Sequence, residues 1–280
     1  MPRLFCFGFG YSARALAQRL TQQGWSVIGT AREPQDASLV RFDRDHPLST
    51  GALIGVTHLL VSIPPDATGD PTLGGARAAL LAGNSTLVWV GYLSTTGVYG
   101  NTDGALVDET SPLAPTSDRA RRRVAAEEAW LALKRDHGLP VHIFRLAGIY
   151  GPGRSVLDEV RDGTARRIVK PGHLFSRIYV EDIATVLAAS IAKPNPGAIY
   201  NVCDDLPAEP AEVVTFAAGM LDAPVPPEIP FEKAELSPMA ASFWADHRRV
   251  SNDKIKNELG VRLAYPNYRD GLWAIYESGG

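Results

Sequence analysis

The sequence predicts an α/β protein with a doubly wound parallel sheet and a smaller C-terminal lobe. Three observations lead to this fold class. Short apolar runs, such as residues 4–9 and 141–146, alternate with helical patterns, such as residues 119–137. Continuous apolar strands separated by helices are typical of a parallel sheet covered on both faces, and right-handed crossovers make that sheet doubly wound. Prolines become frequent after residue 192, which indicates a less regular C-terminal region.

The individual elements follow from the apolar runs and from helical spacing along the chain. One helix places Ala13, Leu16 and Leu20 on a single face, and Pro64 with Pro65 ends one of the strands. We expect strands at residues 4–9, 25–30, 58–63, 86–93 and 141–146, and helices at residues 12–22, 119–137 and 180–192. We assign residues 1–150 to the core, with residues 178–193 returning to it, and residues 151–177 and 194–280 to the lobe.

A glycine-rich turn joins the first strand to the first helix, and it reads Gly8-Phe9-Gly10-Tyr11-Ser12-Ala13. Gly8 allows a tight turn, Gly10 lets the backbone approach a pyrophosphate, and Ala13 lets the helix pack closely on the sheet. The helix N-terminus offers N–H groups and a partial positive charge to the phosphates. The turn therefore predicts a Rossmann-type core that binds a dinucleotide through residues 8–13. The alternative is an ordinary strand–turn–helix whose small residues serve packing alone.

The end of the second strand indicates which dinucleotide is bound. An acidic residue there would accept hydrogen bonds from the adenosine ribose, whereas this strand ends in Gly29-Thr30-Ala31-Arg32. Arg32 could pair with a 2′-phosphate, which favours NADP as the cofactor. NAD is the alternative, because Glu33 could turn inward and Arg32 could be a solvated surface residue.

Four further segments form a recognisable pattern: residues 93–100 (LSTTGVYG), 145–154 (RLAGIYGPGR), 177–184 (RIYVEDIA) and 200–205 (YNVCDD). In type and order, as far as about residue 206, they resemble the extended short-chain dehydrogenases/reductases of the NAD-dependent epimerase/dehydratase family. In the third segment, Tyr179 stands where that family usually has His. Residues 251–272 resemble the atypical branch of the family.

The resemblance implies that the lobe holds the substrate. It also implies an NAD(P)-dependent oxidoreductase or epimerase/dehydratase acting on a polar small molecule, for instance a sugar-nucleotide-like one. Thr95 takes the position of the Ser or Thr that hydrogen-bonds a substrate oxygen; otherwise its hydroxyl caps backbone at a strand end. Asp43 resembles the acid that contacts adenine after the third strand; otherwise it is a turn residue. Ser62 and Pro64 end a strand at the expected cofactor edge, where backbone would line the site.

The active-site motif of the family departs from its usual form in this chain. The family uses a Tyr that transfers a proton, followed four residues later by a Lys that lowers the Tyr pKa and holds the nicotinamide ribose. Aligned on Glu127, those positions hold Arg119 and Arg123, and a register one residue earlier gives Asp118 and Arg122. Arginine stays protonated at neutral pH, so neither register supplies the usual proton donor.

Several interpretations of this departure are open. Tyr99 or Tyr179 could replace the missing acid from another segment. Arg119 and Arg123 could instead bind an anionic group of the substrate or a ribose hydroxyl. The protein could also bind its cofactor without turnover, as a sensor or interaction protein. The simplest structural alternative is a solvated helix face on which Arg123 pairs with Glu127, one helical turn away.

Composition and charge narrow the class of protein further. A net charge of −3 implies no general affinity for nucleic acid, and no apolar stretch approaches the roughly 20 residues that span a bilayer. Cys6 and Cys203 predict no disulfide and a reducing compartment, so we expect a cytoplasmic protein. No metal-ligand cluster is visible, and His142 is expected in the core. The resemblance allows a homodimer through helices flanking the sheet, although the helix after Arg119 is highly charged.

Overall fold

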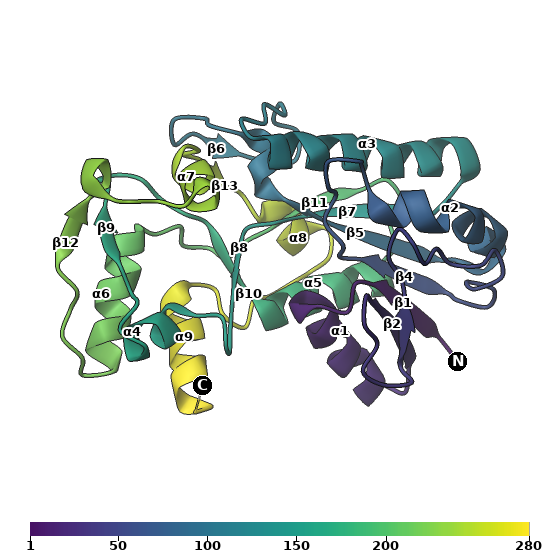
Figure 1. Ribbon diagram of the computed structural model, residues 1–280, viewed down its shortest axis with the longest axis horizontal. Helices are drawn as coiled ribbons and strands as arrows, with labels where there is room; N and C mark the ends of the chain where they lie inside the picture. The colour runs from purple at the N-terminus through teal and green to yellow at the C-terminus, as the bar shows by residue number, and fades with distance from the viewer. Residues whose placement is uncertain (280) are drawn as a thin grey trace.

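A parallel sheet forms the centre of the computed structural model, which describes residues 1–279. Its strands are β1 (Arg3–Phe7), β2 (Ser26–Ala31), β3 (Leu39–Arg41), β4 (His58–Val61), β5 (Trp89–Thr95), β7 (Val141–Leu146) and β11 (Ile199–Val202). Within the described residues these seven strands pair in the order β11-β7-β5-β4-β1-β2-β3, all parallel (Figure 1). The chain changes direction across the sheet between β1 and β4, and α/β proteins bind ligands at the carboxyl ends of strands at such a point.

Helices cover both faces of the sheet, as a doubly wound fold requires. They are α1 (Tyr11–Gln22), α2 (Pro71–Gly83), α3 (Asp118–His137) and α5 (Val180–Ala192). α1 packs against α5 on one face, where Leu16 and Ile183 belong to one buried cluster. α2 and α3 lie on the other face, where Leu80 and Trp130 belong to a second buried cluster (Figure 1). The predicted doubly wound α/β fold is confirmed, because the apolar strands are buried from both sides.

The expected helices and strands occur, and their ends differ by a few residues. β7 and α5 match the predicted ranges, whereas β1 ends at Phe7 rather than at residue 9. Gly8 has a φ of +81°, which interrupts the extended backbone at that point. β5 begins at Trp89 rather than at residue 86, because Asn84–Thr86 form the short 3₁₀ helix η1.

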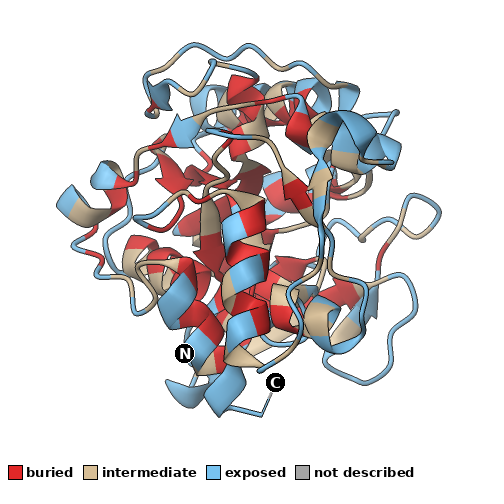
Figure 2. Ribbon diagram, turned by 90° about the vertical axis from the view of Figure 1, so that its left-hand side faces the viewer, coloured by how far each residue is buried: buried red, intermediate tan, exposed pale blue. Residues whose placement is uncertain are grey.

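A smaller lobe lies beside the sheet domain (Figure 1). Its elements are β8 (Gly148–Tyr150), α4 (Val156–Arg161), β9 (Arg167–Val169), β10 (Arg177–Tyr179), α6 (Pro210–Met220), β12 (Glu228–Pro230), η3 (Phe231–Lys233), α7 (Pro238–Trp244) and α9 (Tyr268–Glu277). Leu157, Val213 and Leu272 belong to a third buried cluster that joins α4, α6 and α9. Figure 2 shows buried positions on the inner sides of these helices and exposed positions on their outer sides. The lobe therefore has an apolar core of its own.

The predicted lobe boundary at residue 194 needs a correction, because the chain returns to the sheet domain after it. β11 pairs with β7, with Ile199 opposite Ile143. β13 (Arg249–Val250) pairs with β6 (Leu106–Val107), and α8 (Asp253–Asn257) packs against β11. Pairing between distant segments leaves no trace in the local pattern of either one, so the rise in proline content marked the boundary too early.

The buried histidine and cysteine side chains lie as the sequence predicted. His142 is fully buried, its Nε2 accepts a hydrogen bond from the backbone N–H of Asn195 at 2.9 Å, and burial lowers its pKa to about 4. Cys6 and Cys203, both within the described chain, are buried free thiols. The core histidine and the unpaired cysteines are therefore confirmed. Among residues 1–279, no helix is both long enough and apolar enough to cross a membrane.

Candidate active site

A cleft of about 620 Å³ lies at the carboxyl ends of the strands, between the sheet domain and the lobe. The start of α1, the end of β5 and the start of α3 line it from the sheet domain, and α7 with the segments around β8 and β10 lines it from the lobe. The predicted site residues that it brings together are Gly10, Tyr11, Ser12, Ser62, Thr95, Arg119 and Arg123. Segments far apart in the sequence therefore meet where the strand order places a ligand site.

The two glycines of the glycine turn are needed for different reasons. A Cβ on Gly8 would lie 2.9 Å from both Ile63 Cγ1 and Ser62 Oγ, and φ is +81° there, so the fold itself requires glycine. The Ser62 hydroxyl also donates to the carbonyl of Gly8 at 2.6 Å, which ties β4 to the turn. A Cβ on Gly10 would meet no described atom within 4 Å. Packing therefore does not explain Gly10, and the open space fits the close approach of a pyrophosphate.

The N-terminus of α1 completes this part of the cleft. Gly10 is the N-cap residue, and no side chain in the described chain caps the first turn. The first N–H groups of a helix have no partner within the helix, and they carry its partial positive charge. Tyr11 and Ser12 line the cleft at this point, and Ala13 is fully buried under the helix. The residues present thus fit the phosphates of a dinucleotide.

Six of the predicted cofactor residues lie outside the cleft lining: Gly8 and Ala13, described above, and Phe9, Arg32, Asp43 and Pro64. The ring of Phe9 covers Gly29 of β2, where a Cβ would lie 2.5 Å from Phe9 Cδ2. Arg32 follows β2 and Pro64 follows β4, and both are exposed. Asp43 follows β3, and its carboxylate accepts hydrogen bonds from the His46 ring at 2.7 Å and from backbone N–H groups, which lowers its pKa. Asp43 therefore forms the turn, and its contact with adenine stays a prediction.

Thr95 ends β5 and faces the cleft. Its Oγ1 accepts a hydrogen bond from the N–H of Gly97 at 3.1 Å, which caps the 3₁₀ helix η2 (Thr96–Tyr99). Thr95 thus caps the backbone and lines the cleft at the same time. The hydroxyl proton of Thr95 stays available to a ligand oxygen, because the capping bond uses only an acceptor position.

Arg119 and Arg123 both line the cleft, one helical turn apart on α3. Arg123 is buried, and its Nη1 donates to the carbonyl of Leu93 at 2.5 Å. Arg119 lies over the ring of Phe243 from α7, with Cζ 5.4 Å from the ring centroid. Asp118 and Arg122, the pair from the alternative register, are exposed and lie outside the lining. The two positions given by the alignment on Glu127 therefore line the cleft, and the two positions of the alternative register do not.

Neither tyrosine that could replace the missing acid reaches the cleft. Tyr99 is fully buried, its hydroxyl donates to Asn201 Oδ1 at 2.7 Å, and it accepts from Arg145 Nη1 at 2.8 Å. Tyr179 is also buried, with its ring 4.0 Å from that of Tyr265. Both side chains pack against distant segments and lie outside the cleft lining, and the role of either as the acid stays a prediction.

Two other phenols do line the cleft, Tyr11 and Tyr150. The Tyr11 hydroxyl donates to the carbonyl of Pro152 at 2.9 Å, and the Tyr150 hydroxyl donates to the carbonyl of Asn267 at 3.3 Å. Burial raises the pKa of both phenols. Their hydroxyl protons are thus directed to backbone carbonyls around the lobe.

The simplest structural alternative predicted that Glu127 pairs with Arg123, but in the structure it does not. Its carboxylate lies 2.7 Å from Arg145 Nη2, and both side chains are buried. The Ser94 hydroxyl donates to the same carboxylate at 2.5 Å. The helix spacing predicted a local partner, but β7 supplies a better one because Arg145 can donate to both carboxylate oxygens.

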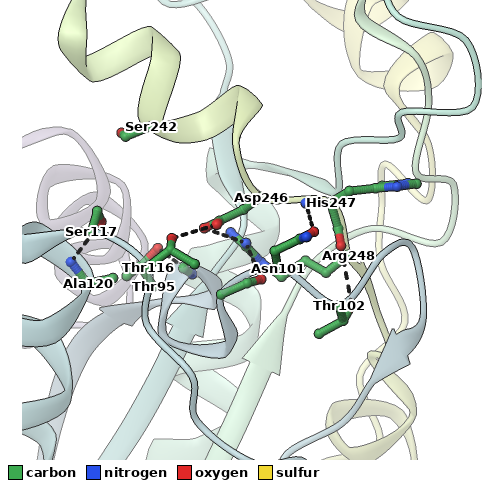
Figure 3. Close-up of polar contacts among 12 residues, drawn as sticks. Thr95, Asn101, Thr102, Thr116, Ser117, Ala120, Ser242, Asp246, His247 and Arg248 are labelled. Atoms are coloured by element: carbon green, nitrogen blue, oxygen red, sulfur yellow. Dashed lines mark hydrogen bonds and ion pairs between the residues drawn. The ribbon is translucent and has the colours of Figure 1, made fainter.

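The lobe contributes a polar pair to which no sequence motif pointed. Asp246 accepts hydrogen bonds from Thr116 Oγ1 at 2.6 Å and from Arg248 Nη1 at 2.9 Å. Arg248 also donates to the carbonyl of Gly100 at 2.9 Å. Figure 3 shows this group beside Thr95. The pair therefore joins the segment after α7 to the loops of the sheet domain.

Positive charge dominates the cleft. Among the described lining residues, Asp246 is the one acidic side chain, and the arginines outnumber it. Burial, followed by the charges of Arg123 and Arg154, lowers the pKa of Arg119. Such a field attracts anions. The lining arginines are Arg119, Arg123, Arg154, Arg177 and Arg248.

Comparisons with known proteins agree with this geometry. A family model described as the NAD dependent epimerase/dehydratase family matches residues 73–203. The solved structure of a functionally unknown conserved protein from Silicibacter pomeroyi DSS is 51% identical, with a TM-score of 0.91, covering 100% of this chain and 99% of that one. Protein YeeZ of Escherichia coli (strain K12) is 26% identical over 288 residues, which cover 95% of this chain and 97% of YeeZ.

A more distant structure supports the fold. The crystal structure of dTDP-glucose 4,6-dehydratase from Bacillus anthracis str. Ames in complex with NAD has a TM-score of 0.79 at 17% identity, covering 99% of this chain and 96% of that one. At this identity the likeness concerns the fold alone. Over residues 73–203, a little under half of its length, the chain is similar to the NAD dependent epimerase/dehydratase family, and the glycine turn and the sheet order agree with this likeness.

Proposed function

We propose that this protein binds NAD(P) on the glycine turn and acts as an oxidoreductase or epimerase/dehydratase on a polar small molecule held in the cleft. One observation carries the proposal. A single cleft joins Gly10 and the uncapped start of α1 to Thr95, Arg119 and Arg123. The nucleotide end and the reacting end of a dehydrogenase site would thus lie in one continuous space.

The residues around the glycine turn would hold the cofactor. The first N–H groups of α1 would bind the pyrophosphate, since Gly10 leaves room for it and no described side chain caps the helix. Arg32, exposed after β2, would bind a 2′-phosphate, which favours NADP over NAD. Asp43 and the strand end at Ser62 and Pro64 would flank the adenosine half. The dehydratase with 17% identity was crystallised with NAD, so NAD stays the alternative.

At the reacting end, the bound nicotinamide would supply hydride transfer. Thr95 would donate its hydroxyl proton in a hydrogen bond to the reacting oxygen of the substrate. Arg123, oriented by its bond to the Leu93 carbonyl, would direct its remaining N–H groups to a hydroxyl or an anion. Arg119 would stabilise negative charge rather than transfer a proton, because a guanidinium stays protonated at neutral pH.

A second function, a cofactor-binding sensor or interaction protein, is favoured by one observation. Arginines occupy the positions of the proton-transferring Tyr and its Lys, and Tyr99 and Tyr179 are both committed elsewhere. The two functions differ in turnover. Incubating the protein with NADPH and a panel of carbonyl and sugar-nucleotide compounds separates them, because consumption of NADPH supports the enzyme, whereas stable binding without consumption across the panel supports the sensor.

The cofactor site is tested by Gly10→Ala. The added Cβ would meet no described protein atom, so the variant should fold normally, but the methyl group would occupy the pyrophosphate position. We expect NADPH affinity, measured by nucleotide fluorescence, to fall by about tenfold or more, as when one good contact is lost. Gly219→Ala on α6 is the matched control, since its Cβ also meets no described atom. Unchanged NADPH affinity in Gly10→Ala would rule out pyrophosphate binding at this turn.

A further inference from the structure

Three arginines at the reacting end of the cleft lack an acidic partner, in contrast to some of the arginines near them. Arg145, Arg248 and Arg121 each form a salt bridge, with Glu127, Asp246 and Asp118 respectively. Arg119, Arg123 and Arg154 form no salt bridge with any described residue. The protein thus leaves these guanidinium groups without a carboxylate at the place where they line the cleft.

These three arginines are also close enough to affect one another. Arg119 lies in the first turn of α3, Arg123 lies one turn further along, and Arg154 precedes α4. The charges of Arg123 and Arg154 both lower the pKa of Arg119, after the effect of burial. Cations held together without an anion repel, and this repulsion is relieved when an anion lies among them.

The surroundings hold two of the guanidinium groups in place. Arg123 is anchored by the Leu93 carbonyl at 2.5 Å, and Arg119 lies over the exposed ring of Phe243. A guanidinium held against an aromatic ring loses less freedom when it binds a ligand. Its planar set of N–H donors matches the two oxygens of a carboxylate or of a phosphate.

We propose that Arg119, Arg123 and Arg154 bind an anionic group, a carboxylate or a phosphate, that the substrate carries near its reacting oxygen. This inference rests on the proposed function, because it places the substrate in the cofactor cleft with its reacting oxygen at Thr95. The arginines that replace the Tyr and Lys then recognise substrate charge instead of transferring a proton. The substrate class becomes a small organic acid or phosphate ester, and a neutral sugar or alcohol is excluded.

The experiment uses the full chain saturated with NADPH and titrates it by calorimetry with malonate and with inorganic phosphate at constant ionic strength. We expect at least one of the two probes to bind the wild-type protein, and the stronger one identifies the preferred anion. Arg119→Gln should weaken that probe by about tenfold or more, as expected for a lost charge-assisted pair. Arg154→Gln, a second variant at an exposed position, should weaken it as well.

Arg122→Gln is the matched control, because Arg122 belongs to the same run on α3 but is exposed and outside the lining. Its probe affinity should equal that of the wild type. Wild-type affinity in both Arg119→Gln and Arg154→Gln would overturn the proposal, and so would displacement of NADPH by the probe, because the arginines would then serve the cofactor. If NADPH itself fails to bind, the proposed function fails, and the same titration without NADPH still tests the arginines.

Discussion

Arg145 and Glu127 form a buried ion pair next to the candidate active site, with Nη2 and Oε2 2.7 Å apart. Arg145 belongs to β7 and Glu127 to α3, one turn after Arg123. Ser94 of β5 and the hydroxyl of Tyr99 complete the same network. The pair therefore sets the position of α3 relative to the strand ends, and with it the position of the arginines that line the cleft.

Removing the charge of Glu127 should destabilise the whole fold. Glu127→Gln leaves the buried Arg145 without its counter-charge, and breaking one partner of a buried pair costs about 3 kcal/mol or more. Urea denaturation at pH 7 measures the change in the free energy of unfolding. Glu128→Gln, at the exposed neighbouring position 3.9 Å from Arg135, should change it by less than about 0.5 kcal/mol. Equal changes in the free energy of unfolding of the two variants would show that the buried pair contributes no more to stability than an exposed one.

The protein should lose stability as the pH falls below the range of an ordinary histidine. His142 is buried and its pKa is lowered from 6.5 to about 4, so the unfolded state binds a proton that the folded state does not between these values. The stabilising effect is fully present above pH 6.5 and is lost as the pH falls towards 4. His142 alone should account for about 2 kcal/mol of the decrease between about pH 7 and 5.

His142→Phe isolates this contribution. The variant loses the hydrogen bond to Asn195, so it should be less stable than wild type at pH 7. Its stability should nevertheless fall less steeply between about pH 7 and 5, because the titrating group is gone. Urea unfolding at a series of pH values gives both slopes, and parallel slopes would argue against titration of His142.

Thr95→Ala should separate catalysis from cofactor binding. The hydroxyl faces the cleft at the end of β5, away from the glycine turn, so we expect turnover to fall by about tenfold or more while NADPH affinity changes little. Thr95→Ser is the conservative control, since it keeps both the hydroxyl and the cap to Gly97. Turnover in Thr95→Ala equal to that of wild type would remove Thr95 from the mechanism.

Arg32→Ala tests the cofactor preference. A guanidinium that pairs with the 2′-phosphate contributes to NADPH binding and not to NADH binding, so only the NADPH dissociation constant should rise, by about tenfold. Arg77→Ala, at an exposed position on α2, is a suitable control. Tighter binding of NADH than of NADPH by the wild-type protein would contradict the assignment of NADP.

Much of the fold could be read from local patterns, because each of those features depends on neighbours in the chain. The apolar run of β7 and the helical spacing of α5 indicated their exact ranges. The glycine turn was recognisable for the same reason, since Gly8 and Gly10 act through their own backbone. The segments that resemble the family also indicated Thr95, Arg119 and Arg123, and all three line the same cleft.

The amino-acid sequence by itself determined the doubly wound sheet and the glycine turn, and it predicted arginines at the positions of the Tyr and Lys, since these features depend on residue type and spacing. Only the tertiary structure decided the partner of Glu127, the burial of Tyr99 and the return of β11 to the sheet. It also brought Asp246 and Arg248 to the cleft. Such contacts join segments distant in the chain, and the competition among possible partners is resolved by packing, which no local pattern records.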